Sequence, residues 1–246
     1  MKGELNFSKM TAAILAGGLG TRLRAVIADR PKVMAEIHGR PFLTYLLDQL
    51  SSAGFRSVVL CTGYMGEQIS QRFGDHYRDM NLVYSREPQP CGTAGALRTA
   101  SPHLGSDPVF VMNGDSYCHA DLRVFGEWYR SHGCRVAMLL ARVADSHRFG
   151  SVSLAPDASV LKFTEKLATH DANWINAGIY LISLPVILSI PASGSVSLEY
   201  DIFPRLIGQG LSGCQTDGQF LDIGTPEDFA KAEKFFARLG KSISNA

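Results

Sequence analysis

The chain has 246 residues and a formal net charge of +1, with 46% hydrophobic and 19% charged residues. This balance is typical of a folded globular protein and excludes an intrinsically disordered one. The near-neutral charge excludes a global basic field, so we expect no nucleic acid and no membrane as partners, and local charges must hold any polyanion. The five cysteines form no CxxC pair, which predicts neither a disulfide framework nor a zinc site and favours the cytoplasm.

Strand-like apolar runs alternate with amphipathic helical patterns as far as residue 141. The expected order is strand 11–16, helix 41–53, strand 57–61, helix 66–73, strand 82–85, helix 93–100, strand 108–112, helix 122–132 and strand 135–141. This alternation predicts βαβ units and an α/β fold with a mostly parallel sheet flanked by helices. The pattern then loosens, and the later elements expected are strands 151–154, 160–164 and 174–182 and helices 198–206 and 226–239.

The chain shows no linker, repeat or low-complexity segment, which predicts one domain over residues 1–246. The first ten residues lack an apolar core, so we expect no signal peptide. The most apolar later stretch, residues 178–190, is too short to span a bilayer.

A glycine-rich segment follows the first expected strand. Residues 15–23 are Leu-Ala-Gly-Gly-Leu-Gly-Thr-Arg-Leu, and Lys32 comes ten residues after Arg22. Glycines let backbone N–H groups approach an anion, and the two cations would supply counter-charges. A dinucleotide fingerprint would need glycine at position 23, and a Walker A loop would need Gly-Lys at positions 22 and 23. An ordinary glycine-rich turn is the alternative, but the two cations favour a polyphosphate ligand.

Two aspartates lie far apart in the sequence. Asp115 follows an expected strand and a glycine, and Asp222 lies between a strand-like run and a helix, 107 positions later (222 − 115). Magnesium takes one or two carboxylates together with substrate phosphates, so the pair predicts a metal site if the fold brings them together. Each aspartate alone is also explained by turn or helix-capping chemistry.

A second glycine-containing turn, residues 91–96, opens the helix expected at 93–100. Its backbone N–H groups could face a base or a ribose, or could only cap the helix. Both interpretations stay open from the sequence.

Further polar residues in the second half are candidates for binding a second substrate. Glu165 and Lys166 follow a strand-like run, where a solvated charge pair is the alternative. Asn176 and Gly178 lie inside an apolar segment, where the alternative is a bulge with a satisfied buried amide. Glu199 is near a helix start, where a negative charge is favoured in any case.

Taken in this order, the motifs resemble the sugar-1-phosphate nucleotidylyltransferases, from Leu15 to about Phe229. The segments that carry the resemblance are 15–23 with Pro31-Lys32, 92–96, 113–115, 176–180, 198–199 and 222–226. Within the family the pattern is most similar to the D-glycero-α-D-manno-heptose 1-phosphate guanylyltransferases. Mannose-1-phosphate guanylyltransferases and muramic-type or glucose-1-phosphate uridylyltransferases share much of it. Val33 and Leu167 stand where the family often has proline after the lysine.

The resemblance implies the Rossmann-like, three-layered nucleotide-diphospho-sugar transferase fold. It implies a cytoplasmic enzyme that transfers a nucleotidyl group from a nucleoside triphosphate to a sugar 1-phosphate and releases pyrophosphate. GTP, heptose 1-phosphate and Mg²⁺ are the implied substrates and cofactor. The half formed by about residues 10–145 would bind the nucleotide, and the half formed by about residues 146–240 would bind the sugar phosphate. Whether the protein forms a homodimer stays an open question at this point.

The resemblance also implies a role for each motif residue. The implied catalytic residues are Arg22, beside the leaving pyrophosphate, and Lys32, beside the α-phosphate. The implied nucleotide-binding residues are Leu15, Ala16, Gly17, Gly18, Gly20, Thr21, Gly92, Thr93, Asn113 and Asp115. The implied sugar-phosphate-binding residues are Glu165, Lys166, Asn176, Gly178 and Glu199, and Asp115 and Asp222 would hold the metal.

Two other classes of protein compete with this interpretation. A catalytically silent sugar-nucleotide sensor could use the same fold, but it would not need Arg22, Lys32, Asp115 and Asp222 together. A glycosyltransferase would normally carry an Asp-x-Asp metal motif, where this chain has Asn113-Gly114-Asp115. The sequence therefore favours the nucleotidylyltransferase.

Overall fold

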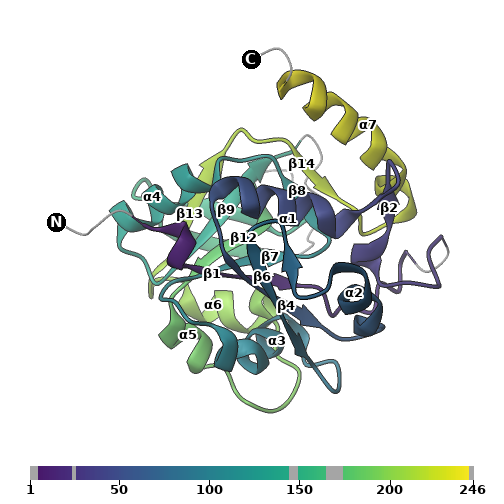
Figure 1. Cartoon of the computed structure of the whole chain (residues 1–246). Helices are drawn as coiled ribbons and strands as arrows, with labels where there is room; N and C mark the ends of the chain where they lie inside the picture. Colours follow the sequence, from purple (N-terminus) through teal and green to yellow (C-terminus); the bar gives the residue numbers. More distant parts are fainter. Residues whose placement is uncertain (1–4, 24–25, 144–148, 165–173, 244–246) are drawn as a thin grey trace.

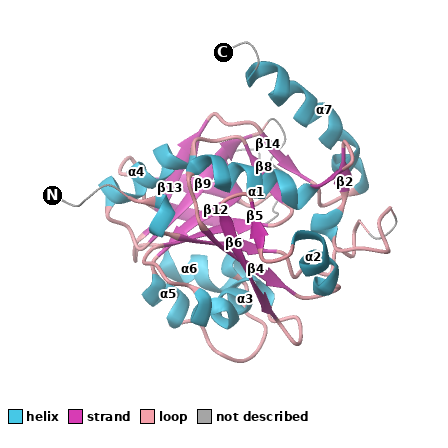
Figure 2. Ribbon diagram, in the orientation of Figure 1, coloured by secondary structure: helices cyan, strands magenta, loops and turns pink. Residues whose placement is uncertain are grey.

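The computed structural model describes residues 5–23, 26–143, 149–164 and 174–243. In this part of the chain, ten strands form one sheet in the order β11-β10-β12-β7-β1-β4-β6-β5, with β9 beside β12 and β13 beside β9. Figure 2 shows the strands gathered between helices on both sides. The expected mostly parallel sheet flanked by helices is confirmed.

The parallel part of the sheet consists of four strands: β7 (Val109–Asn113), β1 (Thr11–Leu15), β4 (Ser57–Thr62) and β6 (Met80–Arg86). These four strands run parallel to one another. Because parallel strands end at the same edge of a sheet, the four loops that follow them meet there. This edge carries the glycine-rich segment of residues 16–20 and the turn at residues 114–115.

The second half of the chain extends the same sheet. β12 (Trp174–Ile182) runs antiparallel to both β7 and β9 (Val136–Arg142), and β13 (Leu211–Thr216) lies parallel to β9. The remaining strands are β10 (Ser151–Leu154) and β11 (Val160–Thr164), β5 (His76–Tyr77), and the short pairs β8 (Ser116–Cys118) with β14 (Phe220–Asp222) and β2 (Glu36–Ile37) with β3 (Arg40–Pro41).

The helices cover both faces of the sheet (Figure 1). One face packs against α1 (Phe42–Ala53), α4 (Leu122–His132) and α7 (Pro226–Ile243), and the other against α3 (Gly92–Ala100), α5 (Leu184–Leu188) and α6 (Phe203–Leu206). Both faces need this cover because successive side chains of a strand point to opposite faces. In β1, Ala12 and Ile14 face the first layer and Ala13 faces the second. α2 (Gly66–Phe73) follows β4.

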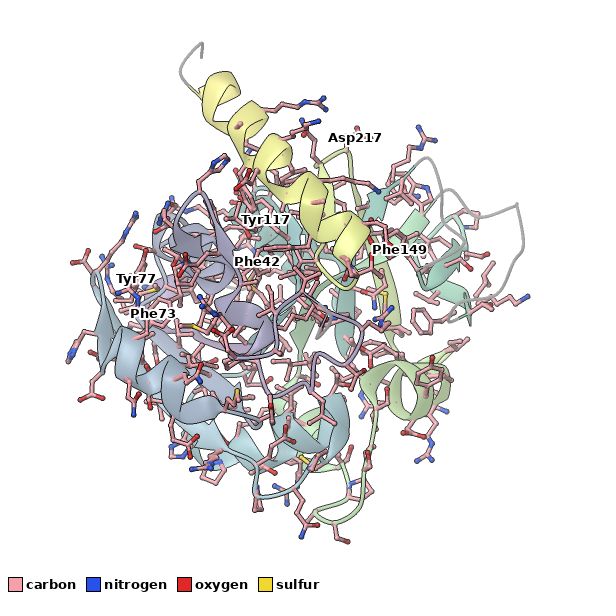
Figure 3. The ribbon with its side chains drawn as sticks, turned by 90° about the vertical axis from the view of Figure 1, so that its right-hand side faces the viewer. Phe42, Phe73, Tyr77, Tyr117, Phe149 and Asp217 are labelled. Carbon is pink, nitrogen blue, oxygen red and sulfur yellow. The ribbon has the colours of Figure 1, made fainter. Side chains whose placement is uncertain are left out.

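The C-terminal helix α7 packs by its aromatic side chains. The ring of Phe236 stacks on that of Tyr45 at 3.9 Å and meets Phe42 and Tyr117 edge-on at 6.3 and 5.1 Å. In Figure 3 the yellow helix passes close to the labelled Tyr117 and Phe42. Since α7 directly follows β14, this packing helps to hold β14 against β8.

Most expected elements coincide with those of the structure, and a few differ. The helix expected at 41–53 begins one residue later, because Pro41 pairs with Glu36 in the β2–β3 ladder. The helix expected at 198–206 is a π-helical turn (Leu198–Ile202) followed by α6. β13 was not predicted, since Gly213 and polar neighbours interrupt its apolar pattern. No helix in the described ranges is long and apolar enough to cross a membrane.

Candidate active site

Three adjoining cavities lie at the carboxyl edge of the parallel strands. The central cavity, of about 340 Å³, is lined mainly by residues 15–19, 113–115, Lys32, Thr93 and Glu199. The β6-side cavity, of about 600 Å³, shares Gly17, Leu19, Glu87 and Pro90 with it and adds Gly63, Tyr64 and Met65. The β14-side cavity, of about 140 Å³, shares Asn113, Asp115 and Glu199 with it and adds Arg22, Asn176, Gly178 and Asp222. Shared residues make the three one continuous trough with Asp115 near its middle.

The glycine loop approaches the neighbouring loops closely at Gly17. A Cβ atom on Gly17 would overlap the Glu87 carboxylate, and one on Gly63 would lie 2.7 Å from the same oxygen, Oε1. A Cβ on Gly18 would meet nothing within 4 Å. Gly17 is therefore needed for packing within the protein, whereas Gly18 leaves its backbone open to the cavity.

Glu87 is a functional candidate that no sequence motif singled out. Its Oε2 accepts hydrogen bonds from the Cys91 backbone N–H at 3.1 Å and from the Cys91 thiol at 2.7 Å. Glu87 lines both the central and the β6-side cavity. The signal that could have found it is the one that found Asp115, a carboxylate directly after a strand of the parallel sheet.

Lys32 and Asp115 form an ion pair with Nζ 2.8 Å from Oδ2, and the lysine side chain is only 10% exposed. Burial works against ionisation of Asp115, but the charge and hydrogen bond of Lys32, with Arg22 further away, hold its pKa below the ordinary value. Lys32 and Asp115, 83 positions apart in sequence, thus meet in the trough.

Asp222 is brought beside Asp115 by the β8–β14 ladder. Asp222 pairs with Ser116 in this ladder, and the Ile223 N–H donates to the Asp115 carbonyl at 2.9 Å. Burial, and then the negative charge of Asp115, raise the pKa of Asp222 to about 6. The Gly224 N–H donates to Asp222 Oδ1 at 2.7 Å and fixes its orientation.

The two aspartates fit a divalent cation. Two carboxylates of like charge repel each other, and this repulsion is one reason why the pKa of Asp222 is raised. A bound cation would relieve the repulsion. Within the ranges that the structure describes, no group of three His, Cys, Asp or Glu residues could hold a metal by itself. Two carboxylates would leave the remaining coordination positions of such a cation to ligands from outside the protein, such as phosphate oxygens.

Asn113, at the end of β7, contributes an unsatisfied acceptor to the same region. Its Oδ1 is buried and has no hydrogen-bond partner in the described structure, and the residue lines the central and β14-side cavities. Buried polar atoms are nearly always paired, so this oxygen marks a position for a donor from a ligand or water.

Arg22 lines the β14-side end of the trough together with Asp115 and Asp222. Its side chain is exposed and lines the β14-side cavity, where it is close enough to Asp115 and Asp222 to lower the pKa of both. A Cβ on Gly224 would lie 3.5 Å from its Nη2. The structure thus brings together the four charged residues Arg22, Lys32, Asp115 and Asp222. Gly20 and Thr21 line none of the three cavities.

Asn176 belongs to a bulge of β12. Its Oδ1 accepts from the Gly178 N–H at 3.0 Å and its Nδ2 donates to the Tyr180 hydroxyl at 2.8 Å. The ladder with β9 shifts register between Asn176 and Tyr180. The predicted alternative, a satisfied amide in a bulge, therefore describes these bonds, although Asn176 and Gly178 also line the β14-side cavity. Glu165 and Lys166 lie outside the described residues.

The turn at residues 91–96 is bound to the second half of the chain. The N–H groups of Ala94 and Gly95 both donate to the Val196 carbonyl, at 3.0 and 3.2 Å. A Cβ on Gly92 would overlap the same carbonyl, so the close backbone approach at Gly92 is made to Val196. The expectation that these N–H groups could face a base or ribose is wrong for Ala94 and Gly95, because both N–H groups already donate to the Val196 carbonyl.

Comparison with known proteins identifies the family of this chain. The family model described as nucleotidyl transferase matches residues 11–238. The chain is 35% identical to a D-glycero-alpha-D-manno-heptose 1-phosphate guanylyltransferase of Aneurinibacillus thermoaerophilus, over 92% of this chain and 97% of that protein. It is also 35% identical to a mannose-1-phosphate guanylyltransferase of Mycobacterium tuberculosis, over 94% of this chain and 65% of that protein.

A solved structure is similar over the same range. The crystal structure of HddC from Yersinia pseudotuberculosis complexed with GMP-PN superposes with a TM-score of 0.82 at 33% identity, over 92% of this chain and 99% of that one. Similarity at this level extends well beyond the motifs to the whole arrangement of strands around the trough. The chain belongs to the nucleotidyl transferase family.

Proposed function

We propose that the protein transfers the guanylyl group of GTP to a sugar 1-phosphate, with heptose 1-phosphate as the favoured acceptor. The observation that carries this proposal is the trough itself, with Lys32, Asp115, Asp222 and Arg22 gathered where its cavities adjoin. Charge of this kind suits reaction at phosphorus, which needs positioning and electrostatic stabilisation more than a protein nucleophile. The three relatives described above are named for, or were solved with, guanine nucleotides.

Glu87 supports guanine as the base. A carboxylate only accepts hydrogen bonds, and guanine is the base that presents two adjacent donors, N1–H and the N2 amino group, on one edge. Glu87 Oε1 has no hydrogen-bond partner within the described structure, while Oε2 is held by Cys91. Adenine, cytosine and uracil would each place an acceptor against the carboxylate, which penalises them.

In the proposed reaction an oxygen of the sugar 1-phosphate attacks the α-phosphorus of GTP and pyrophosphate leaves. Backbone N–H groups around Gly18 would hold the triphosphate, and Lys32 would lie beside the α-phosphate. Arg22 would neutralise negative charge that grows on the pyrophosphate as it leaves. Asp115 and Asp222 would hold Mg²⁺, which when bound supplies charge compensation between phosphate oxygens.

The sugar phosphate is proposed to bind in the β14-side cavity, in the half of the protein formed by residues of about 146–240. Glu199, Asn176 and Gly178 line that cavity, and Glu165 and Lys166 are proposed to complete the site as the family resemblance implies. The nucleotide would lie on residues of about 10–145. We further propose a cytoplasmic location, because all five cysteines are free thiols.

Mannose 1-phosphate is the second candidate acceptor. The mycobacterial mannose-1-phosphate guanylyltransferase is as similar in sequence as the heptose enzyme, at 35% identity. Both candidates share the base, the metal and the chemistry at phosphorus, and they differ only in the sugar.

The test is a grid of four nucleoside triphosphates against heptose, mannose, glucose and muramic-type 1-phosphates. Pyrophosphate release and product mass would be measured with Mg²⁺ present. The proposal predicts the fastest release with GTP and heptose 1-phosphate. A preference for mannose 1-phosphate would replace the acceptor, a preference for UTP would overturn the guanine assignment, and no release with any pair would overturn the function.

A further inference from the structure

A network of hydrogen bonds joins the two sides of the trough. The Cys91 carbonyl accepts from the Val196 N–H at 2.8 Å, and the Val196 carbonyl accepts from the first turn of α3. Thr93 then adds a side-chain link, with its Oγ1 donating to Glu199 Oε2 at 2.7 Å and accepting from the Leu198 N–H at 2.8 Å. The network therefore connects the turn that fixes Glu87 to the residue that lines both the central and the β14-side cavities.

The Thr93 hydroxyl can donate its one proton only to Glu199. A hydroxyl has a single proton to donate, and accepting the Leu198 N–H directs that proton to Glu199. The Ser197 hydroxyl accepts the N–H groups of Glu199 and Tyr200 at 3.1 and 3.2 Å and donates its own proton to the same oxygen, Glu199 Oε2, at 2.8 Å. Two hydroxyl groups from different elements thus hold one carboxylate oxygen.

The other oxygen of this carboxylate stays available. Glu199 Oε1 has no hydrogen-bond partner among the described residues, and Glu199 lines the cavities on both sides of Asp115. A carboxylate held by one oxygen presents the other in a defined direction, which lowers the entropic cost of binding a hydroxyl. Long acidic side chains otherwise lose substantial rotamer freedom when a ligand orders them.

We infer that Thr93 is a positioning residue for Glu199 and thereby sets the affinity for the sugar 1-phosphate. This deepens the proposed function and rests on it, because it assigns the free Glu199 oxygen to a sugar hydroxyl. It also changes the role expected for Thr93, which the family resemblance placed with the nucleotide. The turn that carries Thr93 is contributed by the nucleotide half, so that half helps to shape the sugar site.

The test compares Thr93→Val, which keeps the shape but removes the hydroxyl, with Thr93→Ser, which keeps the hydroxyl. Thr93→Val should raise the KM for the sugar 1-phosphate at least about tenfold with the KM for GTP changed less than about twofold, and Thr93→Ser should restore most of the loss. Thr11→Val is the matched control, because Thr11 is a buried threonine whose hydroxyl accepts the Gly105 N–H at the opposite end of β1.

A second readout separates positioning from a general loss of structure. Glu199→Gln and the double variant Thr93→Val/Glu199→Gln should have similar sugar 1-phosphate KM values, because Thr93 acts through the carboxylate. Additive effects in the double variant, an effect on GTP alone, or equal effects of Thr93→Val and Thr11→Val would each overturn the inference. If Thr93→Val does not fold, Thr93→Ala, which also lacks the hydroxyl, is compared with Thr93→Ala/Glu199→Gln in the same way. Inactivity of the wild-type protein with every sugar 1-phosphate would instead count against the proposed function.

Discussion

The Lys32 ammonium lies 2.8 Å from the carboxylate of Asp115, and Asp222 adjoins this pair through the β8–β14 ladder. The ammonium group therefore pairs with one of the two acidic residues proposed to hold a metal. A divalent cation at Asp115 would compete with Lys32 for the same carboxylate and would free the lysine to contact a phosphate. This relationship makes the lysine both a partner of the acidic pair and a candidate catalytic group.

Replacing Lys32 by methionine should separate these two roles. Turnover should fall at least about tenfold, because a cation next to the reacting phosphate is lost. Mn²⁺ should nevertheless bind more tightly without nucleotide, because no ammonium competes for Asp115. The matched control is Lys231→Met, which breaks a lysine–aspartate pair of 3.1 Å to Asp228, outside the lining of the three cavities. Calorimetric Mn²⁺ titration with unchanged affinity in Lys32→Met would contradict the competition.

Asp222→Asn should change how stability depends on pH. The folded-state pKa of about 6 lies above the ordinary 3.8, so the wild-type carboxyl adds stability that is present below pH 3.8 and is lost as pH rises through about 6. The variant cannot ionise, so without divalent metal it should be the more stable protein at pH 8, by about 1–3 kcal/mol, and the advantage should vanish at pH 4. Asparagine keeps the oxygen that accepts from Gly224.

The measurement for Asp222 is chemical denaturation in EDTA at several pH values between 4 and 8. The same variant should have lost most of its magnesium-dependent activity. A stability difference that stays constant with pH would show that the carboxyl is not held by burial and by Asp115 as described.

Arg22→Ala should depress kcat at least about tenfold, because removing one preorganised charge from a developing oxyanion typically costs that much or more. Arg30→Ala is the control, since Arg30 is nearby in sequence but pairs with the exposed Asp29 and Glu36 at 3.0 and 3.2 Å. Exposed ion pairs of this kind contribute little to the stability of the protein, so Arg30→Ala should leave the fold intact. Equal kcat values for the two variants in steady-state assays would remove Arg22 from the proposed catalytic group.

Gly17→Ala should weaken discrimination between bases. The added methyl group would overlap Glu87 Oε1 and displace the carboxylate proposed to pair with guanine, and Gly63→Ala should act in the same direction. We expect the ratio of kcat/KM for GTP over ATP to fall at least about tenfold, since discrimination of this size comes from paired polar groups. Gly18→Ala meets no protein atom within 4 Å and should leave this ratio unchanged. An unaltered ratio in Gly17→Ala would separate Glu87 from base selection.

The sequence predicted the parallel sheet well, because strands and helices depend on local patterns, and it named the four charged residues of the trough, although only the fold brings them together. Apolar strands such as Thr11–Leu15 and helices with clear ends, such as Leu122–His132, are recognised from a few residues. Asp115 stood out because it follows a strand of this sheet. Asp222 was recognised as a candidate, but the β8–β14 ladder that brings it to Asp115 consists of only three residues on each strand.

Features that depend on long-range contacts could not be predicted. The place of Glu87 directly after a strand can be read from the sequence, but its packing against Gly17 and Gly63 and its bond from Cys91 cannot. The turn at residues 91–96 is typical of a helix start, and nothing in its sequence indicates that Val196 and Glu199 complete its hydrogen bonds. The contacts of this turn with Val196 and Glu199 join segments about a hundred positions apart, and only the folded chain defines them.

The most direct measurement of the central claim follows oxygen atoms through the reaction. Heptose 1-phosphate labelled with ¹⁸O in its non-bridging phosphate oxygens would be incubated with GTP, Mg²⁺ and the protein, and the products examined by mass spectrometry. Attack by the sugar phosphate on the α-phosphorus predicts that the nucleotide sugar retains all of the label and that the pyrophosphate carries none. Label in the pyrophosphate, loss of label from the nucleotide sugar, or pyrophosphate release without a sugar 1-phosphate would contradict the account.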